Sequence, residues 1–173
     1  MSKKTRLILA YIFLALSILM NGFLVFQSCL PANSSMEWSN VALNVAKEIL
    51  PSKTNPDGSV TIWNNVNGSD FIRKLIGHFS FYLIDGALVS LFTYFLFGFT
   101  KNKNLSLLII LIVGVLFSIL TEIIQIFVPG RAGDITDMLL NLSGYLLGCV
   151  IVILIVYLIY RHKKKKTTEL LNN

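Results

Sequence analysis

Residues 105–128 read LSLLIILIVGVLFSILTEIIQIFV, and this stretch decides the class of fold. Glu122 is the one acidic or basic residue in the run. At about 1.5 Å per residue in a helix, the run is long enough to cross a hydrocarbon core of roughly 30 Å. We therefore expect a transmembrane helix that carries a carboxyl group within the bilayer.

Three further runs have the same character and length. They cover residues 7–27, 75–99 and 138–160. Hydrophobic residues make up 54% of the 173 residues and charged residues only 14%, against about 25% charged in a typical soluble domain. The sequence thus predicts an all-α membrane protein, a single domain over residues 1–173 built as a four-transmembrane-helix bundle. It excludes a soluble enzyme and a disordered chain.

Most of the 15 lysine and arginine residues flank the predicted spans. They precede the first span, lie between the second and third, and form a polybasic tail at residues 161–173. Because positively charged flanks face the cytoplasm, we expect a multi-pass protein of the cell membrane with both termini cytoplasmic. This distribution argues against nucleic-acid binding, although the tail can also attract anionic lipid of the inner leaflet.

The predicted outer loop, residues 28–72, contains the pattern of an amphipathic helix. Ser34 and Glu37 have the spacing of a capping box, and apolar residues follow them at helical spacing. We expect a helix over residues 36–50 that lies at the membrane interface and ends before Pro51. A loop packed over the bundle and a lid over a site are the two functional readings of this segment.

Polar and small residues fall on one helical face in each of the last three spans, at about 100° per residue. The second span carries Lys74, His78, Tyr82 and Asp85; the third carries Gly114, Ser118, Glu122 and Gln125; the fourth carries Asp137, Asn141, Gly144 and Gly148. Ionisable groups inside a bilayer are costly and turn towards the bundle interior. Each of these faces is therefore predicted to face the other helices.

The predicted directions of the spans bring these faces together in the outer-leaflet half of the bundle, with Asp85 alone near the midplane. We expect a polar, ligand-binding pocket there. The candidate ligand-binding residues are Arg73, Lys74, His78, Tyr82, Glu122, Gln125, Arg131, Asp137 and Asn141. Gly144 and Gly148 form a G-x-x-x-G pair, which predicts close packing of helices. The alternative is that the charged residues only neutralise one another and stabilise the bundle.

Two blocks of residues resemble the VanZ-like family. The first runs from Arg73 to Phe79, includes Lys74 and His78, and has Tyr82 after it. The second is similar to the family pattern E-x-x-Q, P-G-R, D-x-x-x-N-x-x-G. It consists here of Glu122 and Gln125, then Pro129-Gly130-Arg131, then Asp137, Asn141, Gly144 and Gly148. The resemblance covers essentially the whole chain.

This resemblance implies an integral membrane protein of the Gram-positive cell envelope. The founding member of the family is associated with low-level resistance to teicoplanin, a glycopeptide antibiotic with a fatty acyl tail. The resemblance supplies this phenotype and no reaction. We expect no cofactor and no metal, because one histidine near two acids is a weak set of metal ligands.

Three classes of function remain open, and the first is favoured. In the first, the protein is a non-enzymatic resistance factor whose pocket binds a membrane lipid, a lipoglycopeptide or a polyprenyl-linked cell-wall precursor. In the second, it is a membrane enzyme acting on a lipid-linked substrate, with His78, Glu122 and Asp137 as acid–base groups. The motifs H-E-x-x-H and G-x-S-x-G are missing. In the third, it is a small transporter with Asp85 and Glu122 as relays, which requires a homo-oligomer.

Overall fold

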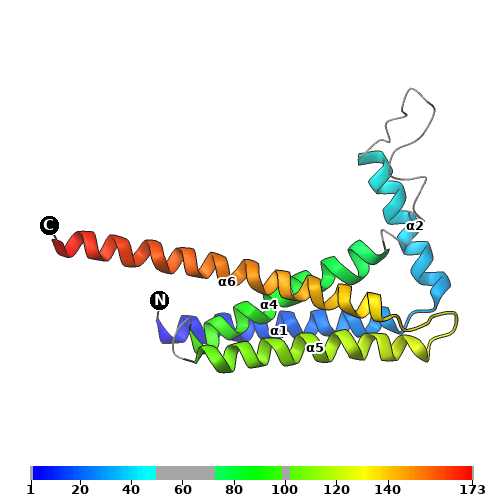
Figure 1. The fold of residues 1–173 in the computed structure, drawn as a ribbon, viewed down its shortest axis with the longest axis horizontal. Coiled ribbons are helices and arrows are strands. Elements are labelled where there is room, and N and C mark those ends of the chain that lie inside the picture. The colour runs from blue at the N-terminus through cyan, green and yellow to red at the C-terminus, as the bar shows by residue number, and fades with distance from the viewer. Residues whose placement is uncertain (1, 50–72, 99–101, 173) are drawn as a thin grey trace.

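The structure, a computed structural model, describes residues 2–49, 73–98 and 102–172. In this part of the chain all regular structure is helical, and four helices are long and apolar enough to cross a membrane. These helices run alongside one another in Figure 1. The prediction of an all-α membrane protein with four transmembrane helices is therefore confirmed.

α1 (Lys3–Ser28) is the first of the four helices. The hydroxyl of Ser2 accepts a hydrogen bond from the backbone N–H of Thr5 and so caps the first turn. The buried face consists mostly of small or polar side chains, namely Ala10, Ser17, Asn21, Leu24 and Ser28. In a membrane, small side chains allow close approach of helices, and polar ones form hydrogen bonds between them.

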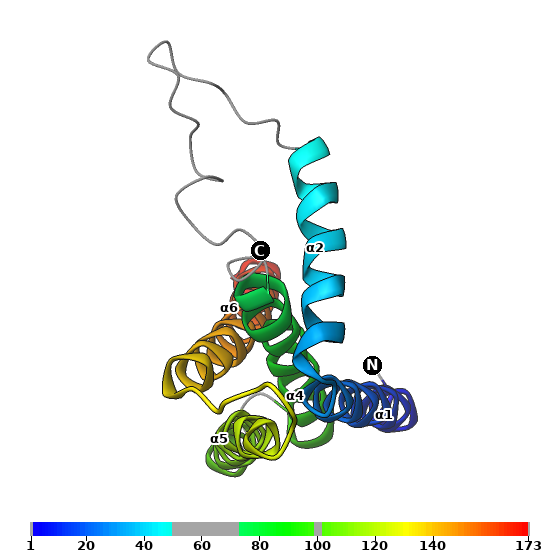
Figure 2. The same ribbon diagram turned by 90° about the vertical axis from the view of Figure 1, so that its right-hand side faces the viewer.

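α2 (Ala32–Ile49) begins at the end of the bundle and extends away from it, steeply inclined to the other helices (Figures 1 and 2). It starts earlier than predicted, so Ser34 lies inside the helix and the predicted capping box is wrong. The helix starts early because the carbonyl of Pro31 accepts the first helical bond, from the N–H of Ser35 at 3.1 Å. Proline loses no hydrogen bond at a helix start. Residues 50–72, which include the predicted end of this helix, lie outside the described residues.

The second membrane-crossing segment has two parts. It begins with η1 (Arg73–Ser80), a π-helical stretch, and continues as α4 (Phe81–Phe97). π-Helical turns are rare in proteins and occur frequently at functional sites. This one contains Lys74 and His78, which are candidate ligand-binding residues.

α5 (Lys103–Ile126) is the third crossing helix, and α6 (Ile135–Asn172) contains the fourth. The polybasic tail continues α6 without a break, because it has no glycine or proline to end the helix. α6 therefore projects past the other helices on the side where both termini lie (Figure 1). We call this side the terminal end of the bundle. The opposite side, at the α5–α6 turn, is the turn end.

α4 lies in the middle of the bundle, with α1, α5 and α6 around it (Figure 2). Burial is the reverse of that in a soluble protein, where apolar side chains are inside. Leu116 and Leu154 are more than half exposed, whereas Asp85 and Asn141 are fully buried. Apolar side chains thus face outward and polar ones inward, as a lipid environment requires.

Candidate functional site

The α5–α6 turn positions Arg131 at the turn end of the bundle. Residues 128–131 form a β-turn closed by the hydrogen bond from the Arg131 N–H to the Val128 carbonyl, at 3.1 Å. Pro129 and Gly130 take the central positions, and Gly130 has a φ of 74°. A proline followed by a residue with positive φ is typical of a type II turn. Glycine is needed at position 130, because other residues are strained at this φ.

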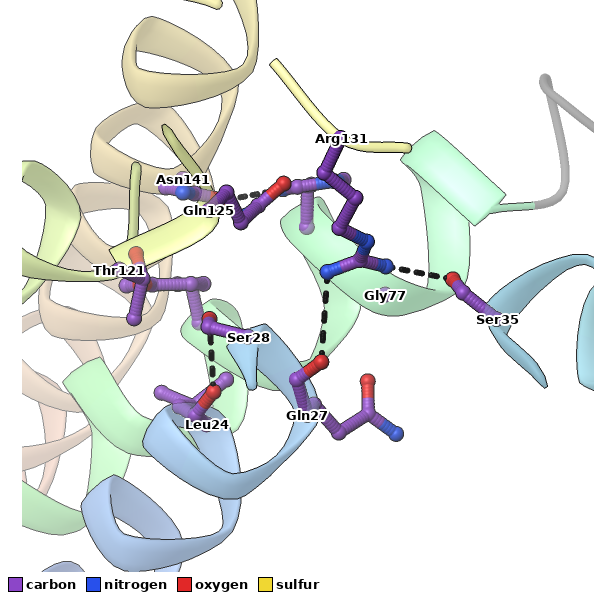
Figure 3. A pocket seen from close by; sticks show the side chains of 11 residues that line it. Leu24, Gln27, Ser28, Ser35, Gly77, Thr121, Gln125, Arg131 and Asn141 are labelled. Carbon is purple, nitrogen blue, oxygen red and sulfur yellow. Dashed lines mark hydrogen bonds between the residues drawn. The ribbon is translucent and has the colours of Figure 1, made fainter. Parts of the chain in front are cut away.

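Arg131 connects three segments of the chain (Figure 3). Its Nη1 donates to the carbonyl of Gln27, in the last turn of α1, at 3.3 Å. Its Nη2 donates to the hydroxyl of Ser35, in α2, at 2.6 Å. The guanidinium therefore lies between α1, α2 and the α5–α6 turn. A guanidinium is also the side chain that binds carboxylate or phosphate groups with two parallel hydrogen bonds.

Glu122 is 3% exposed and accepts hydrogen bonds from three groups. Its Oε1 accepts from the side-chain amides of Gln125 and Asn141, both at 3.2 Å. Its Oε2 accepts from the backbone N–H of Asp134 at 3.2 Å. Asp134 in turn caps α6, because its carboxylate accepts from the N–H of Thr136 at 2.8 Å. The buried carboxylate of Glu122 thus attaches the start of α6 to α5.

Lys74 of η1 and Asp137 of α6 form an ion pair, with 2.8 Å between Nζ and Oδ1. The same Nζ lies 3.8 Å from Oδ2 of Asp134. The side chain of Asp137 is 5% exposed and that of Lys74 is 29% exposed. The pair therefore links the second and fourth crossing segments at the edge of the buried cluster.

His78 occupies the centre of the cluster, between two carboxylates. Its Nδ1 lies 2.9 Å from Oδ1 of Asn141 and 3.7 Å from Oε1 of Glu122. Its Nε2 lies 3.5 Å from Oδ2 of Asp137. Because the amide nitrogen of Asn141 donates to Glu122, the amide oxygen is the acceptor for the Nδ1–H of His78. Polar contacts are therefore continuous from Lys74 through Asp137, His78 and Asn141 to Glu122.

Deeper in the bundle lie Tyr82 and Asp85. The hydroxyl of Tyr82 is 2.6 Å from the hydroxyl of Thr121, so it contacts α5 at the residue before Glu122. Asp85 does not: its Oδ1 accepts from the amide of Asn21 at 2.8 Å and from the hydroxyl of Ser17 at 3.4 Å, both on α1. The structure thus separates Asp85 from the cluster and connects it to α1.

A small cavity lies beside the cluster (Figure 3). It is bordered by His78, Tyr82 and Asn141 and by polar residues of α1, α2, α5 and the turn, among them Gln27, Ser28, Ser35, Thr121, Gln125 and Arg131. Its volume is about 30 Å³. A water molecule needs roughly 10–15 Å³ of such space, so the cavity has room for about two waters and not for an acyl chain.

The structure brings most of the candidate ligand-binding residues together. Lys74, His78, Glu122, Asp137 and Asn141 form the contact chain, and Tyr82, Gln125 and Arg131 surround the same cavity. The side chain of Arg73 lies outside what the structure describes.

Sequence reasoning missed the contribution of α1 and α2, which is Gln27, Ser28 and Ser35. The sequence pattern of α1 could have indicated its contribution, since Ser28 shares a helical face with the polar residues Ser17 and Asn21.

Gly144 and Gly148 lie where α6 meets the second crossing segment. A Cβ at Gly144 would collide with the carbonyl of Phe79, and one at Gly148 would collide with the carbonyl of Leu83. The two backbones are therefore in direct contact along this face. Since the face is covered within the protein itself, a homo-oligomer would need a different surface.

Within the residues that the structure describes, no group of three or more histidine, cysteine, aspartate or glutamate side chains could hold a metal ion. The four crossing helices and the buried polar cluster define a multi-pass helical membrane protein. A family model described as VanZ/LLP1 matches residues 12–157, and the chain belongs to this family. The resemblance seen in the sequence is thus confirmed. Comparisons with curated proteins and with solved structures gave no match.

Proposed function

We propose that the polar cluster binds the anionic headgroup of an envelope amphiphile, and that the protein acts as a non-enzymatic resistance or envelope factor. The amphiphile is a lipoglycopeptide such as teicoplanin or a polyprenyl-linked cell-wall precursor. The observation that carries this proposal is the position of Arg131 beside a water-sized cavity at the turn end. Its guanidinium donates to the Gln27 carbonyl and to the Ser35 hydroxyl.

An anionic headgroup has a reason to replace these partners. A carboxylate or phosphate accepts two parallel hydrogen bonds from a guanidinium and adds the attraction between opposite charges. The Ser35 partner lies on α2, which runs away from the bundle and has few contacts with it (Figure 1). A headgroup that enters between α2 and the turn therefore places an anionic acceptor beside the guanidinium.

The size of the cavity limits what enters it. A volume of about 30 Å³ accepts a small polar group, so the acyl chain of the amphiphile must lie outside, along the helices. Apolar side chains near the turn end are available for this, since Ile123, Ile126 and Phe127 are all strongly exposed. Headgroup and chain thus have separate places, one polar and one facing lipid.

The orientation of the bundle is part of the proposal. Lys3, Lys4, Lys103 and the polybasic part of α6 lie at the terminal end, which supports a cytoplasmic position for that end. The turn end then faces outward, where a glycopeptide or a cell-wall precursor meets the membrane.

Inhibitory concentrations of two antibiotics test the proposal. Producing the protein in a susceptible Gram-positive host should raise tolerance of teicoplanin more than of vancomycin, which has a similar core and no acyl chain. Arg131→Gln should remove the difference, because the glutamine side chain is neutral. Lys4→Gln, which removes one positive charge at the terminal end, is the matched control and should keep it.

Protein abundance by immunoblot and melting in detergent show whether each variant is folded. Equal shifts for the two drugs would contradict the proposal. So would full tolerance in Arg131→Gln at normal abundance.

One observation favours a second candidate, a membrane enzyme acting on a lipid-linked substrate. His78 has a carboxylate near each ring nitrogen, Glu122 at 3.7 Å and Asp137 at 3.5 Å, and such surroundings suit a general acid or base. Purified protein incubated with a polyprenyl diphosphate should then yield a changed lipid by mass spectrometry, and His78→Asn should not. Unchanged lipid in the wild-type reaction would exclude this activity.

A further inference from the structure

A second, larger cavity lies at the terminal end of the bundle, far from the polar cluster. Its volume is about 450 Å³, and it opens between α4, α5 and α6. Pockets that hold small organic ligands have volumes of roughly 300–1,000 Å³. This cavity is therefore large enough for an acyl chain, which the water-sized cavity beside His78 is not.

The buried lining of this cavity is mostly apolar, with the hydroxyls of Ser90 and Thr93 on its α4 side. Ile110 of α5 and Val152 and Val156 of α6 line it, and each of these side chains is less than 10% exposed. Leu107 and Ile153, which are more exposed, line its outer part. A hydrocarbon chain suits such a lining. The chain has no polar atoms, so its transfer into the cavity breaks no hydrogen bonds with water.

The mouth of the cavity is basic. Lys103, the first residue of α5, lines it directly. Arg6 of α1 lies beside it: its Nη2 donates to the carbonyl of Leu96 at 3.3 Å. A Cβ on Gly98, which also lines the cavity, would stand 3.8 Å from Nη1 of Arg6. Two cationic side chains from different helices, Lys103 of α5 and Arg6 of α1, therefore lie at or beside the opening.

Two polar atoms near this mouth lack hydrogen-bond partners among the described residues. They are Nε of Arg6 and the hydroxyl oxygen of Ser106, and both atoms are buried. An unsatisfied buried donor is unfavourable, and a phosphate oxygen would satisfy it. The opening thus provides positive charge together with unused hydrogen-bonding capacity.

We propose that this cavity binds an anionic phospholipid, with one acyl chain between α4, α5 and α6 and the phosphate at Lys103 and Arg6. Basic pockets between transmembrane helices recognise anionic lipid headgroups in this way. The chain enters sideways from the surrounding leaflet, and the first turn of α5 adds the positive end of its helix dipole. This site is separate from the cluster at the turn end. The proposal for one site can therefore be refuted while the proposal for the other stands.

Native mass spectrometry of the full-length protein tests this inference. The protein is presented with equal amounts of phosphatidylglycerol and phosphatidylcholine that have identical acyl chains. We expect one phosphatidylglycerol to be retained preferentially. Lys103→Ala should weaken this retention about fivefold, which corresponds to one basic contact with an anionic headgroup. Lys4→Ala removes an exposed charge from α1 outside the cavity and should leave retention unchanged.

A second variant tests whether the chain lies in the cavity. Ile153→Phe adds bulk at its partly exposed outer wall and should lower retention of phosphatidylglycerol while leaving the melting temperature in detergent unchanged. Equal retention of the two lipids by the wild type would overturn the proposal. Equal effects of Lys103→Ala and Lys4→Ala, or normal retention in Ile153→Phe, would also overturn it, since the lipid would then bind to the basic surface in general.

Discussion

Gly148→Ala is expected to destabilise the protein, even though alanine is the better helix former. A Cβ at this position would collide with the carbonyl of Leu83 and lie 3.0 Å from the backbone nitrogen of Ala87. These are backbone atoms of α4, which cannot turn aside as the end of a flexible side chain can. The added methyl group must therefore push α6 away from α4.

The expected size of the effect follows from two opposing terms. Overfilling a well-packed interior costs typically about 1–3 kcal/mol. Replacing glycine by alanine in a helix gains roughly 0.5–1 kcal/mol. Because the collision involves the backbone, we expect the first term near its upper limit and a net loss of about 2 kcal/mol. Gly22→Ala is the matched control, since nothing lies within 4 Å of a Cβ there, and it should stabilise the protein.

Gly86 tests the same interface from the side of α4. Its Cβ would collide with the carbonyl of Tyr145 on α6, so Gly86→Ala also separates the two helices. Once one variant has separated them, the second should cost less, and the double variant should lose less stability than the sum of the two. Thermal unfolding in detergent, compared across wild type and variants, measures these differences. The reasoning is refuted if Gly148→Ala unfolds at or above the wild-type temperature, or if it behaves like Gly22→Ala.

Three further outcomes are expected. Lys74→Met leaves the carboxylate of Asp137 buried without its cation and should cost about 1–3 kcal/mol. This is less than the 3–5 kcal/mol of a fully buried pair, because Lys74 is 29% exposed. Adding Asp137→Asn should recover part of that loss. A double-mutant cycle by thermal unfolding measures this, and additive effects would show that Lys74 and Asp137 are not coupled. Asp85→Asn keeps a hydrogen-bond acceptor and removes a buried carboxylate that accepts from two neutral donors, Asn21 and Ser17. The variant should therefore unfold at or above the wild-type temperature. A membrane-impermeant maleimide should label the exposed Cys29 in intact cells and leave the buried Cys149 unlabelled; labelling of Cys29 only after permeabilisation would show the opposite orientation.

Much of the fold could be predicted because it depends on local properties of the chain. The length of each apolar run sets the number of crossing helices, and the phase of polar residues sets the side that faces inward. This reasoning correctly placed Glu122 and Gln125 on the buried face of α5. It failed for the start of α2, where the bond from Ser35 to Pro31 outweighed the capping signal at Ser34.

Partners across the bundle could not be predicted from the same properties. The sequence indicates that Lys74, Asp137, Glu122 and Arg131 share one depth, and several pairings satisfy that condition equally. In the structure Lys74 pairs with Asp137, while Arg131 donates hydrogen bonds to Gln27 and Ser35. The choice depends on differences of a few ångströms between side chains on different helices, which periodicity does not resolve.

The sequence by itself determined that the chain crosses a membrane with four helices, that each of the last three presents a polar face to the others, and that it resembles the VanZ family. Only the tertiary structure decided how much space these faces leave. Close contact between the backbones of α4 and α6 at Gly148 closes that interface, the cavity beside His78 keeps room for about two waters, and a cavity of about 450 Å³ opens at the terminal end. Distances between helices depend on contacts between residues far apart in the chain, and for this reason local sequence patterns do not set them.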